Sequence, residues 1–251
     1  MKFIYSLQSE WLKTKRSAAS WLCLAGGFFV PLIYFIAFLK NQNSINDAYP
    51  FVNIWKSHFL QMWQNMAVFL LPMGVILASS LITQMEFKNN TWKQLNTTPQ
   101  SYATIFLAKF SVIVLMILKF FLFFNFGIFF TAIVPCLIFD HHFPIMPVPV
   151  LFFLKVNAKI FLACMPIIAI QYLISLKFKN FLVAIGVGLL GLIGSLIGLG
   201  WKYIYLSPYS YTAQLVAGPK GEVNPQLAAA FYTIVITGIS FYLFISKKEK
   251  G

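Results

Sequence analysis

The first 17 residues alternate apolar and polar positions with the period of an α-helix. Phe3, Leu7 and Trp11 recur every four residues, and charged side chains stand between and after them. Residues at i and i+4 lie on one helical face, so the apolar side chains form a single stripe. Helices of this kind lie flat at a membrane surface. The segment 1–17 is therefore predicted to be an amphipathic interfacial helix and not a cleaved signal sequence.

Six long apolar segments follow, and each is long enough to cross a bilayer. They lie at 18–39, 64–84, 103–134, 151–176, 181–200 and 227–246. About 20 residues cross a hydrocarbon core of about 30 Å at a rise of about 1.5 Å per residue. The third segment exceeds this length, so we expect it to be tilted, broken or extended into water at one end. Pro72 and Pro166 lie inside the second and fourth segments and predict local kinks.

Basic residues in the connecting segments predict the orientation of the bundle. With the N-terminus in the cytoplasm, the cytoplasmic side holds Lys2, Lys13, Lys15, Arg16, Lys88, Lys93, Lys177, Lys179, Lys247, Lys248 and Lys250. The outer side then holds Lys40, Lys56, Lys202 and Lys220, with Lys155 near its boundary. Because positive charge accumulates on the cytoplasmic side, both termini are predicted to be cytoplasmic, as an even number of spans requires.

The expected fold is therefore an all-α integral membrane protein with six transmembrane helices. Residues 1–251 form a single domain, in which the interfacial helix 1–17 precedes a six-span bundle at 18–246 and a basic tail at 247–251. Composition agrees, because hydrophobic residues make up 59% of the chain and charged residues 10%, against roughly a quarter charged in soluble domains. The formal net charge of +13 comes from lysines scattered between apolar segments. That distribution is typical of membrane orientation and contact with anionic lipid, and it argues against nucleic-acid binding.

Residues that could perform catalysis are not arranged for it in this sequence. It contains no GxxxxGK[ST] phosphate-binding loop, no HExxH zinc motif and no GxSxG nucleophile turn. The cysteines are expected to be buried apolar side chains: Cys23, Cys136 and Cys164. The histidines are expected in outer loops, with a metal or pH-sensing role as the alternative: His58, His141 and His142. The acids are expected at helix ends or in loops, which disfavours an intramembrane enzyme or a proton-coupled carrier: Glu10, Asp47, Glu86, Asp140, Glu222 and Glu249.

The loop between the second and third spans is predicted to contain a short helix. Glu86 closes the second span, and Asn90 or Thr91 can cap a helix through a side-chain oxygen. Trp92 and Leu95 are three residues apart and share a face, and Pro99 ends the helix. This apolar face could dock on a protein partner, and the alternative is a helix that lies at the lipid interface.

The pattern Glu86, Thr91, Leu95, Pro99 and Lys109, preceded by SEWLKTKRS near the N-terminus, resembles the ABC type 2 export permease family. The plan of six spans and the Ser207–Pro208 step after span five are also similar to that family. Small size and short outer loops most resemble permeases of bacitracin and lantibiotic self-protection exporters.

The resemblance implies a permease subunit in a bacterial cell membrane, without ATPase activity of its own. The coupling helix of such permeases docks on a separate ATPase dimer, so Glu86, Thr91, Trp92, Leu95 and Pro99 would form that contact. No cofactor would be bound directly, because ATP and Mg²⁺ belong to the partner, and a second permease copy or a related permease would complete the pathway. The cargo would be hydrophobic or amphipathic, such as an antimicrobial peptide or a lipid-linked compound. The alternatives are a non-transporting scaffold or immunity subunit, and a secondary transporter.

Polar residues inside the third and fourth spans are candidates for a substrate path. Lys119 lies midway along the third span with Asn125 further on, and Lys155 and Lys159 share a face of the fourth. Lysines inside a membrane usually face a cavity or a partner. These groups could bind a phosphate or carboxylate, although Lys155 and Lys159 could instead reach the headgroups and Lys119 could mark a misplaced span boundary.

Small residues form a narrow stripe on the fifth span. At 100° per residue, this stripe contains Ala184, Gly188, Gly191, Ser195 and Gly198. Such a stripe allows another backbone to approach closely. We expect packing within the subunit, and a seam between two permease copies is the alternative.

Overall fold

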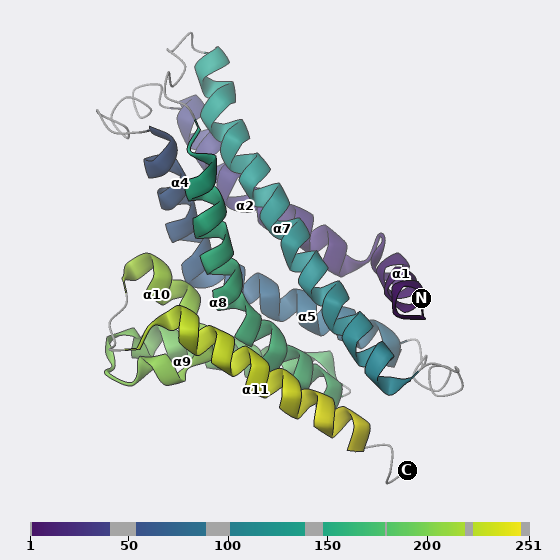
Figure 1. Cartoon of the computed structure of the whole chain (residues 1–251). Helices are drawn as coiled ribbons and strands as arrows, with labels where there is room; N and C mark the ends of the chain where they lie inside the picture. The colour runs from purple at the N-terminus through teal and green to yellow at the C-terminus, as the bar shows by residue number, and fades with distance from the viewer. Residues whose placement is uncertain are drawn as a thin grey trace.

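The computed structural model describes residues 2–40, 54–88, 101–138, 148–178, 180–218 and 223–246, and the elements formed there are helices. The surface helix is α1 (Lys2–Thr14). The longer helices of the bundle are α2 (Ala18–Lys40), α4 (Ile54–Asn65), α5 (Leu71–Lys88), α7 (Tyr102–Ile138), α8 (Val150–Lys177), α9 (Phe181–Ile197) and α11 (Pro225–Ser246). Within these described ranges, six stretches are long and apolar enough to span a membrane, which confirms the expected all-α six-span fold. Figure 1 shows these helices packed obliquely around a shared interior.

The second span begins earlier than the sequence predicted. It runs from Trp55 to Met85, whereas the apolar pattern placed its start at residue 64. A π-helical turn, η1 (Met66–Leu70), joins α4 to α5, and the Leu71 amide donates to the Met66 carbonyl five residues back. Pro72 explains this turn, because its ring has no N–H and crowds the preceding turn of an α-helix. Polar residues such as His58 concealed the first half of the span.

The third span is one unbroken helix of 37 residues, α7, packed along α2. A Cβ on Gly127 would lie 2.7 Å from the Pro31 ring, and one on Gly27 would lie 3.2 Å from the Phe120 carbonyl. These two glycines therefore allow the helices to touch closely. Lys119 is level with Ser20, near the start of α2. The first 17 residues of α7 consequently extend about 25 Å beyond that level.

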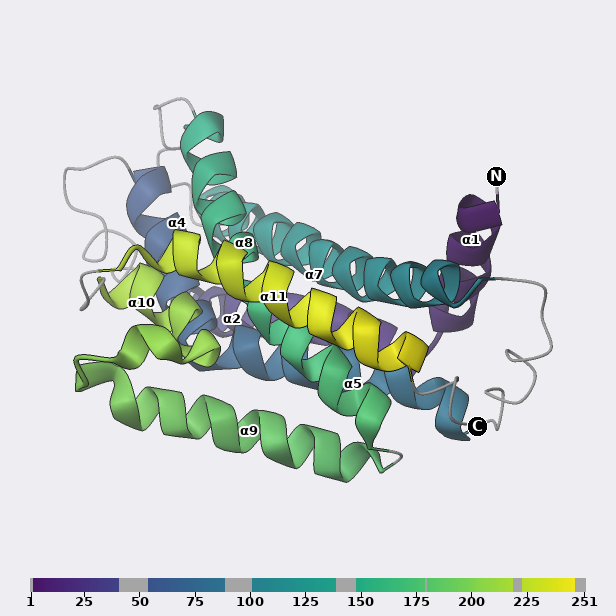
Figure 2. The same cartoon turned by 60° about the horizontal axis from the view of Figure 1, so that its bottom comes forward.

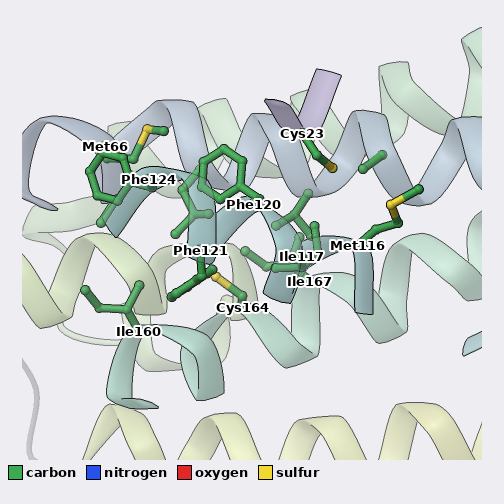
Figure 3. Close-up of a cluster of buried hydrophobic side chains, with 14 of the residues drawn as sticks. Cys23, Met66, Met116, Ile117, Phe120, Phe121, Phe124, Ile160, Cys164 and Ile167 are labelled. Carbon is green, nitrogen blue, oxygen red and sulfur yellow. The ribbon is translucent and has the colours of Figure 1, made fainter. Parts of the chain in front are cut away.

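The interior of the bundle is filled by aromatic and aliphatic side chains from α2, the second span, α7 and α8. Figure 3 shows Phe120, Phe121 and Phe124 of α7 between Met66 and Cys164. Trp63 is fully buried, and its ring meets Phe124 edge-on at 4.6 Å. This continuous core fixes the second, third and fourth spans together. By contrast, only 22% of the fifth span and 11% of the sixth are buried.

The surface helix α1 and the end of α11 lie at the same end of the bundle (Figures 1 and 2). Figure 2 shows α1 standing across the long axis of α7, near the end where α7 begins. The two helices are in contact there. An arrangement with both chain ends on one side matches the even number of spans, and the cytoplasmic identity of that side stays a prediction.

The segment between the fifth and sixth spans folds back into the bundle. It forms the 3-10 turns η2 (Gly198–Gly200), η3 (Ile204–Leu206) and η4 (Pro208–Ser210), followed by α10 (Tyr211–Ala217), which packs on α4 and η1. Tyr211 and Thr212 are fully buried. Tyr211 donates from its hydroxyl to the Tyr205 carbonyl at 2.7 Å, which closes the turn on itself. The sequence had indicated only a short outer connection here.

Candidate functional site

The candidate coupling site lies where α5 ends and α7 begins. Glu86 belongs to the last turn of α5, although its side chain is outside the described part of the chain. Thr91, Trp92, Leu95 and Pro99 also lie outside the described residues, so the coupling helix stays a prediction. Its downstream boundary is described, and there the structure shows how α7 starts.

Ser101 caps the first turn of α7. Its Oγ accepts from the Thr104 amide at 3.2 Å and lies 2.7 Å from the Thr104 hydroxyl. A serine in this position satisfies a free backbone donor at a helix N-terminus. The 37-residue helix α7 therefore begins at Tyr102, three residues after Pro99.

A buried ion pair joins α1 to α7 just beyond this cap. Lys109 Nζ donates to Glu10 Oε2 at 2.8 Å, and Lys13 Nζ donates to Glu10 Oε1 at 2.6 Å. The side chains of Glu10 and Lys109 are only 11% and 4% exposed. Removing one partner from a buried pair typically costs about 3–5 kcal/mol, because the other charge stays buried without compensation. The surface helix is therefore held on the α7 segment nearest to the predicted coupling loop.

The neighbouring lysines keep the Glu10 carboxyl group ionised. Burial by itself would raise the pKa of Glu10, but the Lys109 ammonium and the hydrogen bonds from Lys109 and Lys13 lower that pKa below its ordinary value. Glu10 consequently stays ionised at neutral pH. The sequence contained a signal for the pairing: Glu10 is the only acid before Asp47, and Lys109 lies alone in an apolar segment.

Lys119 and Asn125 contact different neighbours. Lys119 donates to Ser20 of α2 at 2.7 Å, and its ammonium lies 5.7 Å from the centre of the Phe123 ring. Lys155 and Lys159 are exposed on α8. Lys119 thus contacts Ser20 near the start of α2 and Phe123 on its own helix, whereas Lys155 and Lys159 are exposed, so the three ammonium groups have different surroundings.

Asn125 takes part in a reciprocal amide pair with Asn157 of α8. Asn125 donates to Asn157 Oδ1 at 3.0 Å, and Asn157 donates to Asn125 Oδ1 at 2.8 Å. Asn125 also donates to the Phe121 carbonyl at 2.7 Å. Two reciprocal hydrogen bonds between these partly buried amide side chains therefore link α7 to α8. The sequence had indicated only Asn125 at this point.

The small-residue stripe of the fifth span is covered by residues of the same chain. The Ala184 carbonyl accepts from Gln171 at 2.7 Å, and Gln171 also donates to Ser80 at 2.8 Å. A Cβ on Gly188 would lie 2.5 Å from Gln171 Oε1, and one on Gly191 would lie 2.8 Å from the Tyr209 ring.

The last residues of the stripe, Ser195 and Gly198, contact the folded-back segment between the fifth and sixth spans. Ser195 Oγ pairs with Ser207 Oγ and donates to the Gly191 carbonyl at 2.7 Å. A Cβ on Gly198 would lie 3.4 Å from Ile204. Ser207 precedes Pro208, so the Ser-Pro step noted in the sequence is one of the contacts of the stripe.

His58 lies inside the second span, and its expected place in an outer loop is wrong. Its ring is 1% exposed, Nε2 lies 3.0 Å from the Thr131 hydroxyl of α7, and Tyr34 and Phe38 of α2 flank it. The earlier start of α4 explains the error. His141 and His142 lie outside the described residues. Within the described ranges, no group of three His, Cys, Asp or Glu side chains could hold a metal ion.

Comparison with protein-family models identifies a family for this chain. The model described as "ABC-2 family transporter protein" covers residues 6–195, well over half of the 251-residue chain. This range begins within α1 and ends in α9, so it includes the Glu10–Lys109 pair, the predicted coupling loop and most of the small-residue stripe. Comparison with curated proteins gives no match. With its six apolar helices, the chain belongs to the ABC-2 family of transporter proteins and is a multi-pass membrane component of that family.

Proposed function

We propose that this chain is the permease subunit of an ATP-driven exporter and that a separate ATPase dimer docks on its segment 86–99. The observation that carries the proposal is the buried Glu10–Lys109 pair. It joins the surface helix to the first part of α7, and α7 in turn starts three residues after Pro99, where the predicted coupling helix ends. A displacement of this loop by the ATPase would therefore move α1 and α7 together.

Such a unit could transmit ATP-driven closure of the ATPase to the outer half of the bundle. Beyond the ion pair, α7 contacts α2 from about Lys119 onward and is linked to α8 by the Asn125–Asn157 pair. ATP and Mg²⁺ would bind the partner dimer. A second permease copy, or a related permease, would complete the pathway in a bacterial cell membrane.

Copurification tests this proposal. The full chain is expressed in its native host and purified in mild detergent, and bound proteins are identified. Wild type should retain a P-loop ATPase, and Trp92→Asp should lose it, because a carboxylate cannot dock in an apolar groove. Trp201→Asp is the matched control, since Trp201 is 60% exposed in the connection between the fifth and sixth spans. Equal retention by the wild type and Trp92→Asp would reject docking through this loop.

The cargo is proposed to be a hydrophobic or amphipathic compound such as an antimicrobial peptide or a lipid-linked molecule. Lys119, Lys155 and Lys159 are the candidates for contact with its anionic group. Replacing all three with glutamine should reduce export-dependent resistance of cells to the cargo while leaving the ATPase bound. Unchanged resistance would remove these lysines from the path, and a chain that retains the ATPase without changing sensitivity to any compound would favour the scaffold alternative.

A further inference from the structure

A groove opens between α8 and α11 at the end of the bundle where both helices terminate. Its volume is about 530 Å³, and its lining includes Leu173, Leu176, Lys177, Ser240, Leu243 and Phe244. The walls are mainly apolar, and Ser240, which lies along them, donates its hydroxyl to the Ile236 carbonyl of its own helix. Lys177, the last residue of α8, and Ser246, the last residue of α11, also line the groove. The charged group of the α8–α11 groove thus lies at the end where the two helices terminate.

Lys177 lines that end of the groove and its side chain is exposed. In the sequence, Lys179 follows it by two residues, and Lys247 and Lys248 come directly after Ser246; these three lysines lie outside the described residues. The carbonyl ends of two helices carry partial negative charge, so the helices alone would repel an anion. Among the described residues that line the groove, Lys177 is therefore the group that would attract an anion.

We propose that the α8–α11 groove binds an anionic phospholipid of the cytoplasmic leaflet, with an acyl chain between the two helices and the phosphate at Lys177. Two features select this ligand. The apolar walls match an acyl chain, and basic groups beside grooves between spanning helices on the cytoplasmic side bind anionic headgroups. With both termini in the cytoplasm, as the positive-inside charge count predicts, the polar end would lie in the leaflet that contains such lipids.

The position of the groove gives the site a structural consequence. Phe244 and Phe241 of α11 pack on Phe106, in the α7 segment that carries Lys109. Only 11% of the sixth span is buried within the chain, so contacts with lipid supply much of its surroundings. A lipid in the α8–α11 groove would therefore help to hold α11 against the part of α7 that precedes the bundle core.

Native mass spectrometry of the full chain in detergent tests the site. The protein is titrated with phosphatidylglycerol and with phosphatidylcholine that carries the same acyl chains. Wild type should bind phosphatidylglycerol more tightly. Lys177→Gln should weaken phosphatidylglycerol about fivefold and leave phosphatidylcholine unchanged, a factor that corresponds to about 1 kcal/mol per lysine. Lys15→Gln replaces an exposed lysine in the turn that follows α1 and should change neither.

A second pair of variants separates the groove from general surface charge. Leu243 is 50% exposed, so Leu243→Trp should fill the groove without disturbing the fold and should weaken both lipids. Leu227→Trp places the same residue at a 71% exposed position on the same helix and should have no effect. Equal binding of the two lipids by wild type, or unchanged phosphatidylglycerol binding in Leu243→Trp, would overturn the proposal. Displacement of phosphatidylglycerol by excess inorganic phosphate would likewise overturn it in favour of a simple phosphate site.

Discussion

Replacing Gly188 with alanine tests whether the small-residue stripe of α9 is a packing surface within the chain. The added Cβ would lie 2.5 Å from Gln171 Oε1 and 2.8 Å from Ile76 Cγ2. Gln171 cannot withdraw freely, because its Nε2 donates both to Ser80 and to the Ala184 carbonyl. The substitution therefore forces α9 away from α5 and α8, or it breaks these two hydrogen bonds.

The expected cost follows from these contacts. Overpacking of a well-filled interior costs about 1–3 kcal/mol. Alanine also has a higher helix propensity than glycine, which would offset up to about 1 kcal/mol. Gly186→Ala corrects for this gain, since Gly186 lies on the same helix and its Cβ would have nothing within 4 Å. The difference in stability between the two variants should then be about 1–3 kcal/mol, with Gly188→Ala the less stable.

Thermal unfolding of the purified chain in detergent measures this difference. Each kcal/mol corresponds to about 2–4 °C in the midpoint for chains of about this length. Both variants are compared with wild type in the same detergent, so that effects of the micelle cancel. Equal midpoints for Gly188→Ala and Gly186→Ala would refute the account of this seam.

Three further predictions concern the polar contacts between helices. Glu10→Gln should release α1 from α7 and increase the proteolysis of α1, whereas exchanging the charges in Glu10→Lys with Lys109→Glu should restore part of the protection. Because the pKa of Glu10 is lowered in the fold, its contribution to stability is complete above the ordinary pKa of 4.5 and is lost as the pH falls through the lowered value. The protection of the α1 amides against hydrogen exchange, corrected for the intrinsic exchange rate at each pH, should therefore fall only in acid. Asn157→Leu should lower the unfolding midpoint by more than an exposed substitution on α8 does, because Asn125 loses a reciprocal partner, and an unchanged midpoint would contradict that role.

Helical periodicity predicted the parts of the fold that depend on neighbours in the sequence. Five of the six spans begin within two residues of the expected positions, because long apolar segments are visible without tertiary information. The exception is the second span. Its first half contains Lys56, His58 and Gln61, which lower the local hydropathy, yet His58 is buried through its contact with Thr131, 73 residues away. A sequence window cannot contain that contact.

In the candidate site, too, the sequence predicted the local features and not the contacts between distant residues. The amphipathic pattern of residues 1–17 predicted a surface helix, but it did not indicate which element the helix would contact. The Glu10–Lys109 pair joins residues 99 positions apart, and only two isolated opposite charges in apolar surroundings suggested it. The folded-back segment at 204–217 was missed because its buried tyrosines and serines have no helical or strand period. Long-range burial, and not local propensity, decides these features.

Photocrosslinking from position 92 tests directly whether an ATPase docks on segment 86–99. A photoreactive residue replaces Trp92 in the full chain, irradiation is carried out in native membranes, and the adducts are identified. Position 92 should give an adduct with a P-loop ATPase, and position 201, the exposed tryptophan in the connection between the fifth and sixth spans, should give none. An ATPase adduct from position 201, or lipid adducts alone from position 92, would contradict docking through this segment.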